Sequence, residues 1–487
     1  MAPARKILFL TNSELGQCNV AFAVAEEFLR RGEFDVHIGS YSPLAGLVEE
    51  LNKRVGCGRP VEFHEIPGPS MTDLAIRSNI GLLFHRPGVK GATRGFQKVS
   101  TAMKNWRPSE YHQAYRSCLA MIEKLSPDIV VVDPILHVGL DACRTAKARV
   151  AILWPVPLKD VVIAIQPKAG IFWKYPVYAS PFLLRFGKKP LTLSLSTGSG
   201  FPFPLPWKLI LKNIYLVFRV IMTLTIGKSE PDELQDGKKP EGRNPFPLVN
   251  AYSKESLSLT PAFKELDFPL HVPANVISCG PILRKCPPLS TSDPELEAWL
   301  TKPTVLISLG SHVRLSESIA VEMAKGVRMV IAERPDMKIL WKLKYDWESS
   351  DEFQKVLGAF ITAGWVKVVS WIQADIMSVL ETGRIATYVH HGGANSYFEA
   401  CKVGAPQVIL PQWLDTYDCA TRVEWIGIGV NGSRIAAPGV EAEEFSKALL
   451  HVMSDEGISA KSAAVKDLCK GEGRIEAHDR MIEFCSN

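Results

Sequence analysis

A polar segment at residues 390–399 combines residue types that could bind a phosphate group. It reads HHGGANSYFE and lies between a predicted buried strand and a predicted helix. Glycines let a backbone approach a ligand closely, and the unpaired N–H groups at the start of a helix favour an anion. We therefore predict that Gly393, Asn395 and Ser396 bind a diphosphate at the helix start. His391, at the strand end, could donate a further hydrogen bond to it.

The same residues have a purely structural alternative. Glu399 lies about one helical turn beyond Asn395, where its carboxylate could accept two ribose hydroxyls. However, Ser396-x-x-Glu399 is also the pattern of a capping box, which joins the two side chains to the first N–H groups of a helix and needs no ligand. Taken alone, the segment leaves both interpretations open.

Other predicted strand ends carry side chains suited to the rest of such a ligand. The indole face of Trp371 could stack on a nucleobase, and Gln373 could reach the edge of that base. Ser311 could contact phosphates from the opposite side, and Asp415 could accept sugar hydroxyls. Because the carboxyl ends of parallel strands meet at one edge of a sheet, we expect a single ligand site built mainly from residues 371–418.

Two α/β units must position these residues. At 487 residues, the chain exceeds the roughly 250–300 residues that one core supports. Residues 6–39 read as strand, helix (20–31) and strand, and residues 128–133 and 149–154 add apolar strands typical of a parallel sheet covered on both faces. Strands and helices alternate again over residues 304–411. The predicted fold class is therefore α/β, with two doubly wound Rossmann-like domains facing across a cleft.

The predicted domain boundaries follow changes in composition. The N-terminal domain is expected at residues 1–280, and a Pro- and aromatic-rich insertion at about 154–247 interrupts its regular alternation. A Pro-rich linker follows at 281–300, and the C-terminal domain covers 301–465. We expect residues 466–487 to form a C-terminal helix that packs back toward the N-terminal domain.

The composition excludes several classes of protein. With 46% hydrophobic and 22% charged residues, the chain is typical of a globular protein. The net charge of +5 is too small to indicate a nucleic-acid partner. Neither domain opens with the Gly-x-Gly-x-x-Gly turn of NAD(P) dehydrogenases. Ten scattered cysteines without zinc-ligand spacing predict no metal site, and they predict the reduced thiols of a cytoplasmic protein.

One apolar stretch, residues 209–226, raises the question of membrane contact. Lys212, Asn213 and Arg219 interrupt it, and each charge at the centre of a spanning helix costs about 2.5–3.5 kcal/mol. We predict a buried or surface-lying amphipathic helix and no transmembrane span, with peripheral membrane contact as an open alternative. The N-terminal residues read as a strand and not as a signal peptide.

The polar segments together resemble the donor signature of the family 1 UDP-glycosyltransferases, and most closely that of the fungal branch. That signature runs from a Trp through His-x-Gly-x-Asn-Ser-x-x-Glu and Gly-x-Pro to an acidic residue. Here it reads Trp371, residues 391–399, residues 404–406 and Asp415. The donor-binding residues that the resemblance implies are Gly16, Ser311, Trp371, Gln373, His391, Gly393, Asn395, Ser396, Glu399, Asp415 and Thr416.

The resemblance implies a GT-B fold, with the acceptor in the N-terminal domain and the nucleotide sugar in the C-terminal domain. It further implies inverting transfer from a UDP-sugar co-substrate to a small lipophilic acceptor, with no cofactor and no metal, as in the glycosylation of secondary metabolites. UDP-glucose is only the default donor. Many plant relatives end the signature with Asp-Gln, where the Gln helps to choose glucose, whereas this chain has Asp415 and Thr416.

The catalytic base that the resemblance implies is missing. In the wider family a His after the first strand removes the acceptor proton, and an Asp after a later strand orients that His. Asp133 matches the Asp, but Gln17 occupies the position of the His. A neutral amide cannot take up a proton.

Three explanations remain open. Glu14, on the same loop, could act as the base, and so could His137 if the chain turns helical after Asp133. Alternatively, a phenolic acceptor with a pKa near 10 needs little more than orientation by Gln17. We favour the third explanation, which predicts that Glu14→Gln and His137→Gln each keep most turnover on phenols.

Two other interpretations of function stay open, namely an epimerase-like enzyme and an inert UDP-sugar-binding homologue. For the acceptor, we expect a pocket lined collectively by aromatic side chains of the insertion, so that replacing several of them alters acceptor choice. These side chains are Trp154, Trp173, Tyr175, Phe201, Phe203 and Trp207.

Overall fold

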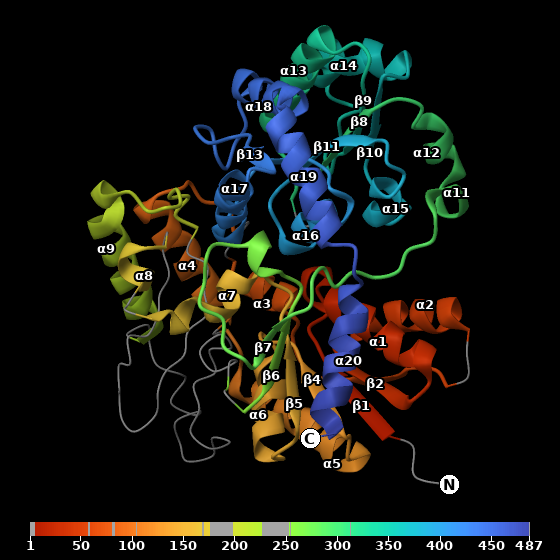
Figure 1. Cartoon of the computed structure of the whole chain (residues 1–487), viewed down its shortest axis with the longest axis vertical. Coiled ribbons are helices and arrows are strands. Elements are labelled where there is room, and N and C mark those ends of the chain that lie inside the picture. The colour runs from red at the N-terminus through yellow and green to blue at the C-terminus, as the bar shows by residue number, and fades with distance from the viewer. Residues whose placement is uncertain are drawn as a thin grey trace.

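The computed structural model describes residues 5–56, 59–79, 83–103, 105–167, 170–175, 198–225, 253, 255–311 and 313–486. The predicted insertion at residues 154–247 therefore lies partly outside the described residues. The described chain forms two parallel β-sheets with helices packed around each of them, and the two units lie one above the other in Figure 1.

The N-terminal sheet has seven parallel strands in the order β3-β2-β1-β4-β5-β6-β7. The strands are β1 (Arg5–Leu10), β2 (Phe34–Ser40), β3 (Glu62–Glu65), β4 (Ile129–Val132), β5 (Val150–Leu153), β6 (Leu257–Thr260) and β7 (Val276–Ser278). Its helices are α1 (Leu15–Arg31), α2 (Ala45–Val55), α3 (Met71–Arg77), α4 (Val89–Met103), α5 (Pro108–Leu125), α6 (His137–Thr145), α7 (Leu158–Val162), α8 (Gly170–Trp173) and α9 (Trp207–Thr225), with short 3₁₀ turns η1 (Ser42–Leu44), η2 (Ile163–Ile165) and η5 (Lys264–Leu266).

The C-terminal sheet has six parallel strands in the order β10-β9-β8-β11-β12-β13. They are β8 (Thr304–Ser308), β9 (Lys338–Lys342), β10 (Val366–Val369), β11 (Ile385–His390), β12 (Gln407–Ile409) and β13 (Gly429–Asn431). The helices are α11 (Leu289–Ser292), α12 (Pro294–Trp299), α13 (Glu317–Glu333), α14 (Asp351–Thr362), α15 (Ile376–Leu380), α16 (Ala394–Val403), α17 (Leu414–Ile426), α18 (Ala442–Ser454), α19 (Glu456–Leu468) and α20 (Gly473–Ser486). α11 and α12 lie within the predicted linker.

Alternate residues of the central strands face two different cores. In β4, Val130 and Val132 belong to one apolar cluster, whereas Ile129 and Val131 belong to the other. All four side chains are buried. The apolar run without polar alternation therefore reflects a sheet that is covered on both faces, as the sequence predicted.

The first helix begins earlier than predicted. α1 starts at Leu15 and not at residue 20, and Glu14 is its N-cap residue with an extended backbone. Gly16 and Asn19 are weak helix formers, so sequence propensity placed them in the preceding loop. As a consequence, Gly16 and Gln17 lie in the first turn of α1, at the carboxyl edge of the N-terminal sheet.

The C-terminal helix α20 leaves the C-terminal unit and packs along α1 (Figure 1). Ala477 and Met481 of α20 share an apolar cluster with Phe28 of α1. The ring of His478 lies 4.2 Å from that of Phe28. The end of the chain thus belongs to the N-terminal core.

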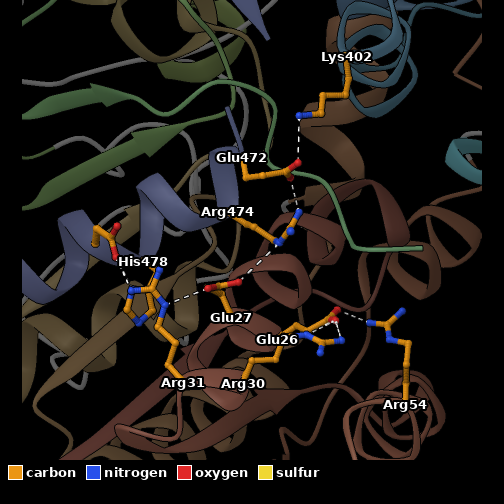
Figure 2. A network of polar contacts seen from close by, with 10 residues as sticks. Glu26, Glu27, Arg30, Arg31, Arg54, Lys402, Glu472, Arg474 and His478 are labelled. Carbon is orange, nitrogen blue, oxygen red and sulfur yellow. Dashed lines mark hydrogen bonds and ion pairs between the residues drawn. The ribbon is translucent and has the colours of Figure 1, made fainter. Parts of the chain in front are cut away.

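A network of charges tethers the segment that crosses between the two units (Figure 2). Lys402, near the end of α16, donates to the backbone carbonyls of residues 469–471 at 2.9–3.5 Å and pairs with Glu472 at 3.3 Å. Glu472 also pairs with Arg474 at 2.5 Å, and Arg474 lies 3.7 Å from Glu27 of α1. The chain of contacts therefore links helix α16 to helix α1.

Two buried ion pairs join the units directly. Arg422 of α17 donates to Asp267 at 3.0 Å, and Lys159 of α7 lies 3.0 Å from Asp418 of α17. Each unit thus contributes one cation and one anion. All four side chains are at most 4% exposed, which makes this contact a fixed part of the interface.

Among the residues that the structure describes, no helix is long and apolar enough to cross a membrane. The apolar stretch that the sequence singled out forms α9, which carries the charges of Lys208, Lys212 and Arg219.

Candidate active site

The start of α16 decides between the two interpretations of residues 390–399. Gly393 is the N-cap residue, and no side chain of the described residues bonds the first N–H groups of the helix. Ser396 lies inside the first turn, where its Oγ is 3.1 Å from the hydroxyl of Tyr388. The capping-box interpretation is therefore wrong, because Ser396 is not at the N-cap. The backbone N–H groups of this turn have no side-chain acceptor and can bind an anion.

His391 is held beside this turn by two glycines. A Cβ atom on Gly310 or on Gly393 would lie 2.7 Å from the ring of His391. Gly310 also has a positive φ of +84°, which disfavours other residues. The ring of Trp413 lies 5.3 Å from that of His391. This packing fixes the imidazole between the loop after β8 and the start of α16.

The neighbouring His390 has a structural role. It is fully buried, its Nδ1 accepts from the N–H of Gly392 at 3.1 Å, and its Nε2 therefore donates to Oε1 of Gln407 at 3.0 Å. Burial lowers the pKa of His390 to about 4, so the ring is neutral. His390 therefore stabilises the glycine turn.

Glu399 borders a small polar cavity between the two units. The cavity volume is about 20 Å³, which holds about one water molecule. Burial raises the pKa of Glu399 to about 8, and the nearby charge of Asp375 adds to this effect. The cavity is lined by Asn19, Ile282, Leu283, Arg284, Cys286, Asp375, Met377, Asn395 and Glu399.

Trp371 presents an exposed indole at the end of β10, and two lysines surround it. The side chain is 44% exposed, and the Nζ atoms of Lys342 and Lys344 lie 4.6 and 5.1 Å from its ring centroid. Burial, followed by the charge of Lys344, lowers the pKa of Lys342 to about 8. Lys344 also donates to the carbonyl of Ser311 at 2.5 Å. Sequence reasoning missed both lysines, because a charged residue near a strand end carries no signal of its own.

Gln373 is exposed two residues beyond Trp371. Its side chain therefore lies on the same loop as the indole.

Asp415 and Thr416 lie in the first turn of α17, but they differ in their surroundings. Burial raises the pKa of Asp415 to about 7, and Asp160 of α7 contributes to the shift, so a carboxylate from each unit lies here. Thr416 is fully buried, and its hydroxyl accepts from the N–H groups of Gln412 and Trp413 at 2.9 and 3.0 Å. Thr416 thus stabilises the turn and does not reach the ligand side.

His85, which sequence reasoning missed, holds the start of the same helix. Its Nε2 accepts from the N–H of Leu414 at 2.9 Å, and its Nδ1 donates to the carbonyl of Arg86 at 2.9 Å. Burial lowers the pKa of His85, so this neutral form is favoured. Only the fold brings residue 85 to residue 414, and no local pattern predicts that contact.

On the opposite side of the cleft, Asp133 is held by three N–H groups. Its Oδ2 accepts from the side chain and the backbone of Asn12, and its Oδ1 accepts from the N–H of Ile135. Burial nevertheless raises its pKa to about 6. Asn12, which sequence reasoning missed, is therefore the partner of this carboxylate.

Two side-chain oxygen atoms at the start of α1 have no hydrogen-bond donor among the described residues. Oε1 of Glu14 accepts from the N–H and the hydroxyl of Thr72 at 2.8 and 3.0 Å. Oε2 of Glu14 and Oε1 of Gln17 are buried and have no hydrogen-bond partner among the described residues. A hydroxyl group of a bound molecule could satisfy either atom.

His137 is the first residue of α6, but aromatic rings enclose it. The rings of Trp106 and Tyr111 lie 5.9 and 5.7 Å away, and Nδ1 lies 3.1 Å from the carbonyl oxygen of Ile135. Burial lowers the pKa of this buried imidazole. Its packing is that of a core residue.

The two sides of the cleft meet at the helix starts. The side chain of Asn395 donates to the carbonyl of Leu15 at 3.3 Å, next to the exposed Gly16. Asn395 is thus brought to the turn of α1 that carries Gly16 and Gln17, although 380 positions separate it from Leu15 along the chain.

Among the described residues, one group could hold a metal ion, and it lies on the edge strand β3 and its neighbour β2 in the N-terminal sheet. It consists of His37, Glu62 and His64. Nδ1 of His37 lies 3.1 Å from Nε2 of His64, a distance that a hydrogen bond between the rings explains. No residue of the donor segment belongs to this group.

A large cavity lies beside α7 and α8 in the N-terminal unit. It has a volume of about 620 Å³, and Trp173 and Tyr175 of the predicted aromatic set line it. Phe203 stacks on Tyr175 with ring centroids 5.8 Å apart. Trp154 and Phe201 are buried in the core, and Trp207 is exposed elsewhere. The aromatic set is therefore divided between core, cavity and surface.

Comparisons with known proteins point in one direction. The family model described as "Erythromycin biosynthesis protein CIII-like, C-terminal domain" matches residues 360–472. The glycosyltransferase sdnJ from Sordaria araneosa is 34% identical over 522 residues, covering 98% of each chain. A UDP-glycosyltransferase from Talaromyces amestolkiae is 26% identical over 76% of this chain and 65% of its own. The structure of a UDP-glucosyltransferase from Polygonum tinctorium, described as capable of glucosylating indoxyl, has a TM-score of 0.63 at 15% identity over 100% of both chains.

Two parallel-sheet domains of this kind are the GT-B architecture, so the predicted fold class is confirmed. The chain belongs to the family 1 UDP-glycosyltransferases and is a UDP-dependent glycosyltransferase. The relatives do not favour the epimerase or inert-homologue interpretations.

Proposed function

We propose that the enzyme transfers a sugar, by default glucose, with inversion from a UDP-sugar to the hydroxyl of a small lipophilic acceptor such as a phenol. The observation that carries the proposal is the uncapped first turn of α16, with His391 fixed beside it. The helix dipole and the free N–H groups of this turn stabilise the negative charge of a departing diphosphate.

The surrounding residues fit the other parts of a UDP-sugar. In this proposal Glu399, which lines the cavity between the units, accepts the ribose hydroxyls, and the exposed ring of Trp371 stacks on the uracil. Lys342 and Lys344 add positive charge near that ring. Asp415 is placed to accept hydroxyls of the sugar, and Asp160 supplies a second carboxylate from the N-terminal domain.

The hydrogen bonds of Glu14 favour this residue as the catalytic base more strongly than the sequence alone did. Thr72 holds one carboxylate oxygen of Glu14 and leaves Oε2 for the acceptor hydroxyl, while Gln17 orients that hydroxyl. The acceptor oxygen then attacks the anomeric carbon, and its proton passes to Oε2 of Glu14. The bond from the anomeric carbon to UDP breaks, and the electron pair leaves with the diphosphate.

A turnover assay tests the proposal. We expect that incubation with UDP-glucose and a panel of phenols yields UDP and a product heavier by one hexose, with a β-linkage from an α-linked donor. UDP-galactose and UDP-N-acetylglucosamine serve as competing donors. Retention of the anomeric configuration, or no transfer from any UDP-sugar, would contradict the proposed reaction.

Glu399 should make UDP affinity depend on pH. Ribose hydroxyls donate to the ionised carboxylate, whereas a pKa of about 8 leaves the empty site mostly protonated at pH 7. UDP should therefore bind about fivefold more tightly at pH 8 than at pH 7, measured by calorimetry. Glu399→Gln should remove this slope and weaken UDP binding about 10–100-fold at pH 8.5.

The matched control is Glu381→Gln. Burial also raises the pKa of Glu381, but this residue is the C-cap of α15 and does not line the cavity. This variant should keep the wild-type slope. Equal pH dependence in wild type and Glu399→Gln would remove Glu399 from the ribose site.

A further inference from the structure

Helix α9 exposes an apolar stripe on the surface of the N-terminal domain. Trp207 is 76% exposed, Leu211 78% and Phe218 56%, and Ile214 and Tyr215 continue the stripe. The opposite face of α9, with Leu216 and Val220, packs into a cluster with Phe96 of α4. The helix thus has one face in the core and a second apolar face in solvent, which is unusual for a surface helix.

All charged residues of α4 and α9 are basic. Neither α4, with 15 residues, nor α9, with 19 residues, contains an acidic residue. Lys208, Lys212 and Arg219 of α9 are exposed beside the stripe. Lys90 and Arg94 of α4 are exposed on the helix that packs against α9. Within these two described helices, an apolar face with aromatic residues is accompanied only by cations, which is the chemistry that binds the headgroup region of an anionic bilayer.

The position of α9 gives this surface a connection to the large cavity. α4, α8 and α9 lie together at the outer edge of the N-terminal domain, away from α20 (Figure 1). Asn213 of α9 is fully buried and donates to the carbonyls of Phe172 and Tyr175 at 3.1 and 3.2 Å. Tyr175 lines the 620 Å³ cavity. The exposed helix is therefore bonded to the cavity wall.

We propose that α9, supported by α4, is a docking surface for the headgroups of an anionic phospholipid bilayer. The helix lies in the interface plane, with its aromatic and aliphatic side chains among the lipid headgroups and its cations against their phosphates. Docking brings the large cavity close to the bilayer, from which a lipophilic acceptor can enter. That last consequence rests on the proposed function, whereas docking itself does not.

Vesicle sedimentation with the full chain tests the proposal without any use of activity. The probes are vesicles of phosphatidylcholine alone and vesicles with about 30% phosphatidylserine. Wild type should bind the anionic vesicles at least about tenfold more strongly, and added salt should reduce this binding. The triple variants Trp207→Ser/Leu211→Ser/Phe218→Ser and Lys208→Ala/Lys212→Ala/Arg219→Ala should each lose at least about tenfold.

Matched controls change residues of the same kind on other surfaces. Ile76→Ser/Ile435→Ser removes two exposed side chains outside α9, and Lys447→Ala/Lys470→Ala removes two exposed cations. These variants should bind vesicles like wild type. All variants should retain UDP affinity, which shows that the donor site is folded.

Four results would overturn the proposal. Equal binding to neutral and anionic vesicles would exclude recognition of anionic headgroups. Loss of binding in the control variants but not in the α9 variants would move the surface elsewhere. Failure of wild type to bind any vesicle would indicate that another part of the chain covers the stripe. Sedimentation of wild type without vesicles, if the α9 variants do not show it, would indicate that a second copy of the chain covers the stripe.

Discussion

Glu14→Gln is expected to lower kcat on an alkyl alcohol acceptor by about 10²–10⁴-fold, because a positioned general base contributes that much to proton transfer. In wild type, Oε1 of Glu14 accepts from both the N–H and the hydroxyl of Thr72. The amide of the variant has the same size, and its oxygen can still accept these bonds. It cannot take up a proton at the atom that replaces Oε2. Steady-state kinetics with saturating UDP-glucose measure the loss.

A phenol should lose less than an alkyl alcohol, because its pKa near 10 lets it ionise with less help. UDP affinity should stay unchanged in this variant. His137→Gln is the matched control, since His137 is packed between Trp106 and Tyr111. If Glu14→Gln retains full turnover on alkyl alcohols while His137→Gln loses a thousandfold, the base is His137.

Restoring a histidine offers an independent test of the same site. The double variant Glu14→Gln/Gln17→His places an imidazole in the first turn of α1, where the family's base is expected. Part of the lost turnover should return, because Gln17 already has an oxygen atom without a partner among the described residues. No recovery would indicate that Gln17 does not face the acceptor.

Arg422→Met is expected to destabilise the protein by about 3–5 kcal/mol, because it leaves the carboxylate of Asp267 buried without its cation. Both side chains are at most 1% exposed, and the guanidinium also lies 5.5 Å from the ring of Phe268. Because Arg422 and Asp267 come from different domains, the loss of stability should appear as separation of the two domains. Urea unfolding followed by intrinsic fluorescence measures it, with a lower midpoint expected.

The double variant Arg422→Met/Asp267→Asn should recover part of this stability, since it removes the uncompensated charge. The Glu443 and Lys447 pair on the surface of α18 is the control, and replacing Lys447 with Met should leave the midpoint unchanged. An unchanged midpoint for Arg422→Met would show that the interface does not depend on this ion pair.

Local patterns in the sequence predicted the repeating strands and helices and singled out the segment that we propose binds the donor. The apolar run of β4 can only be buried on both faces, and this determines a parallel sheet with helices around it. The glycines and the Asn395-Ser396 pair after β11 mark a helix start that accepts an anion. These features depend on residues close together in the chain, so the sequence carries their signal directly.

Contacts between distant residues needed the tertiary structure. The choice between a capping box and an open helix start depended on where α16 begins, and that boundary differs by only a few residues between the two interpretations. Thr416 is buried only in the folded protein. The hydrogen bond from the N–H of Leu414 to His85 joins residues that are 329 positions apart. No periodicity or local propensity encodes such a contact.

The sequence by itself therefore determined the class of fold and singled out the segment proposed to bind the donor, because strand burial and helix starts are local properties. Only the tertiary structure decided which groups surround the proposed acceptor site. Glu14 is held by Thr72, Asp133 by Asn12, and Gln17 is left with an oxygen to satisfy. These partners come from different elements, and only packing of the complete fold brings their polar atoms within hydrogen-bonding distance.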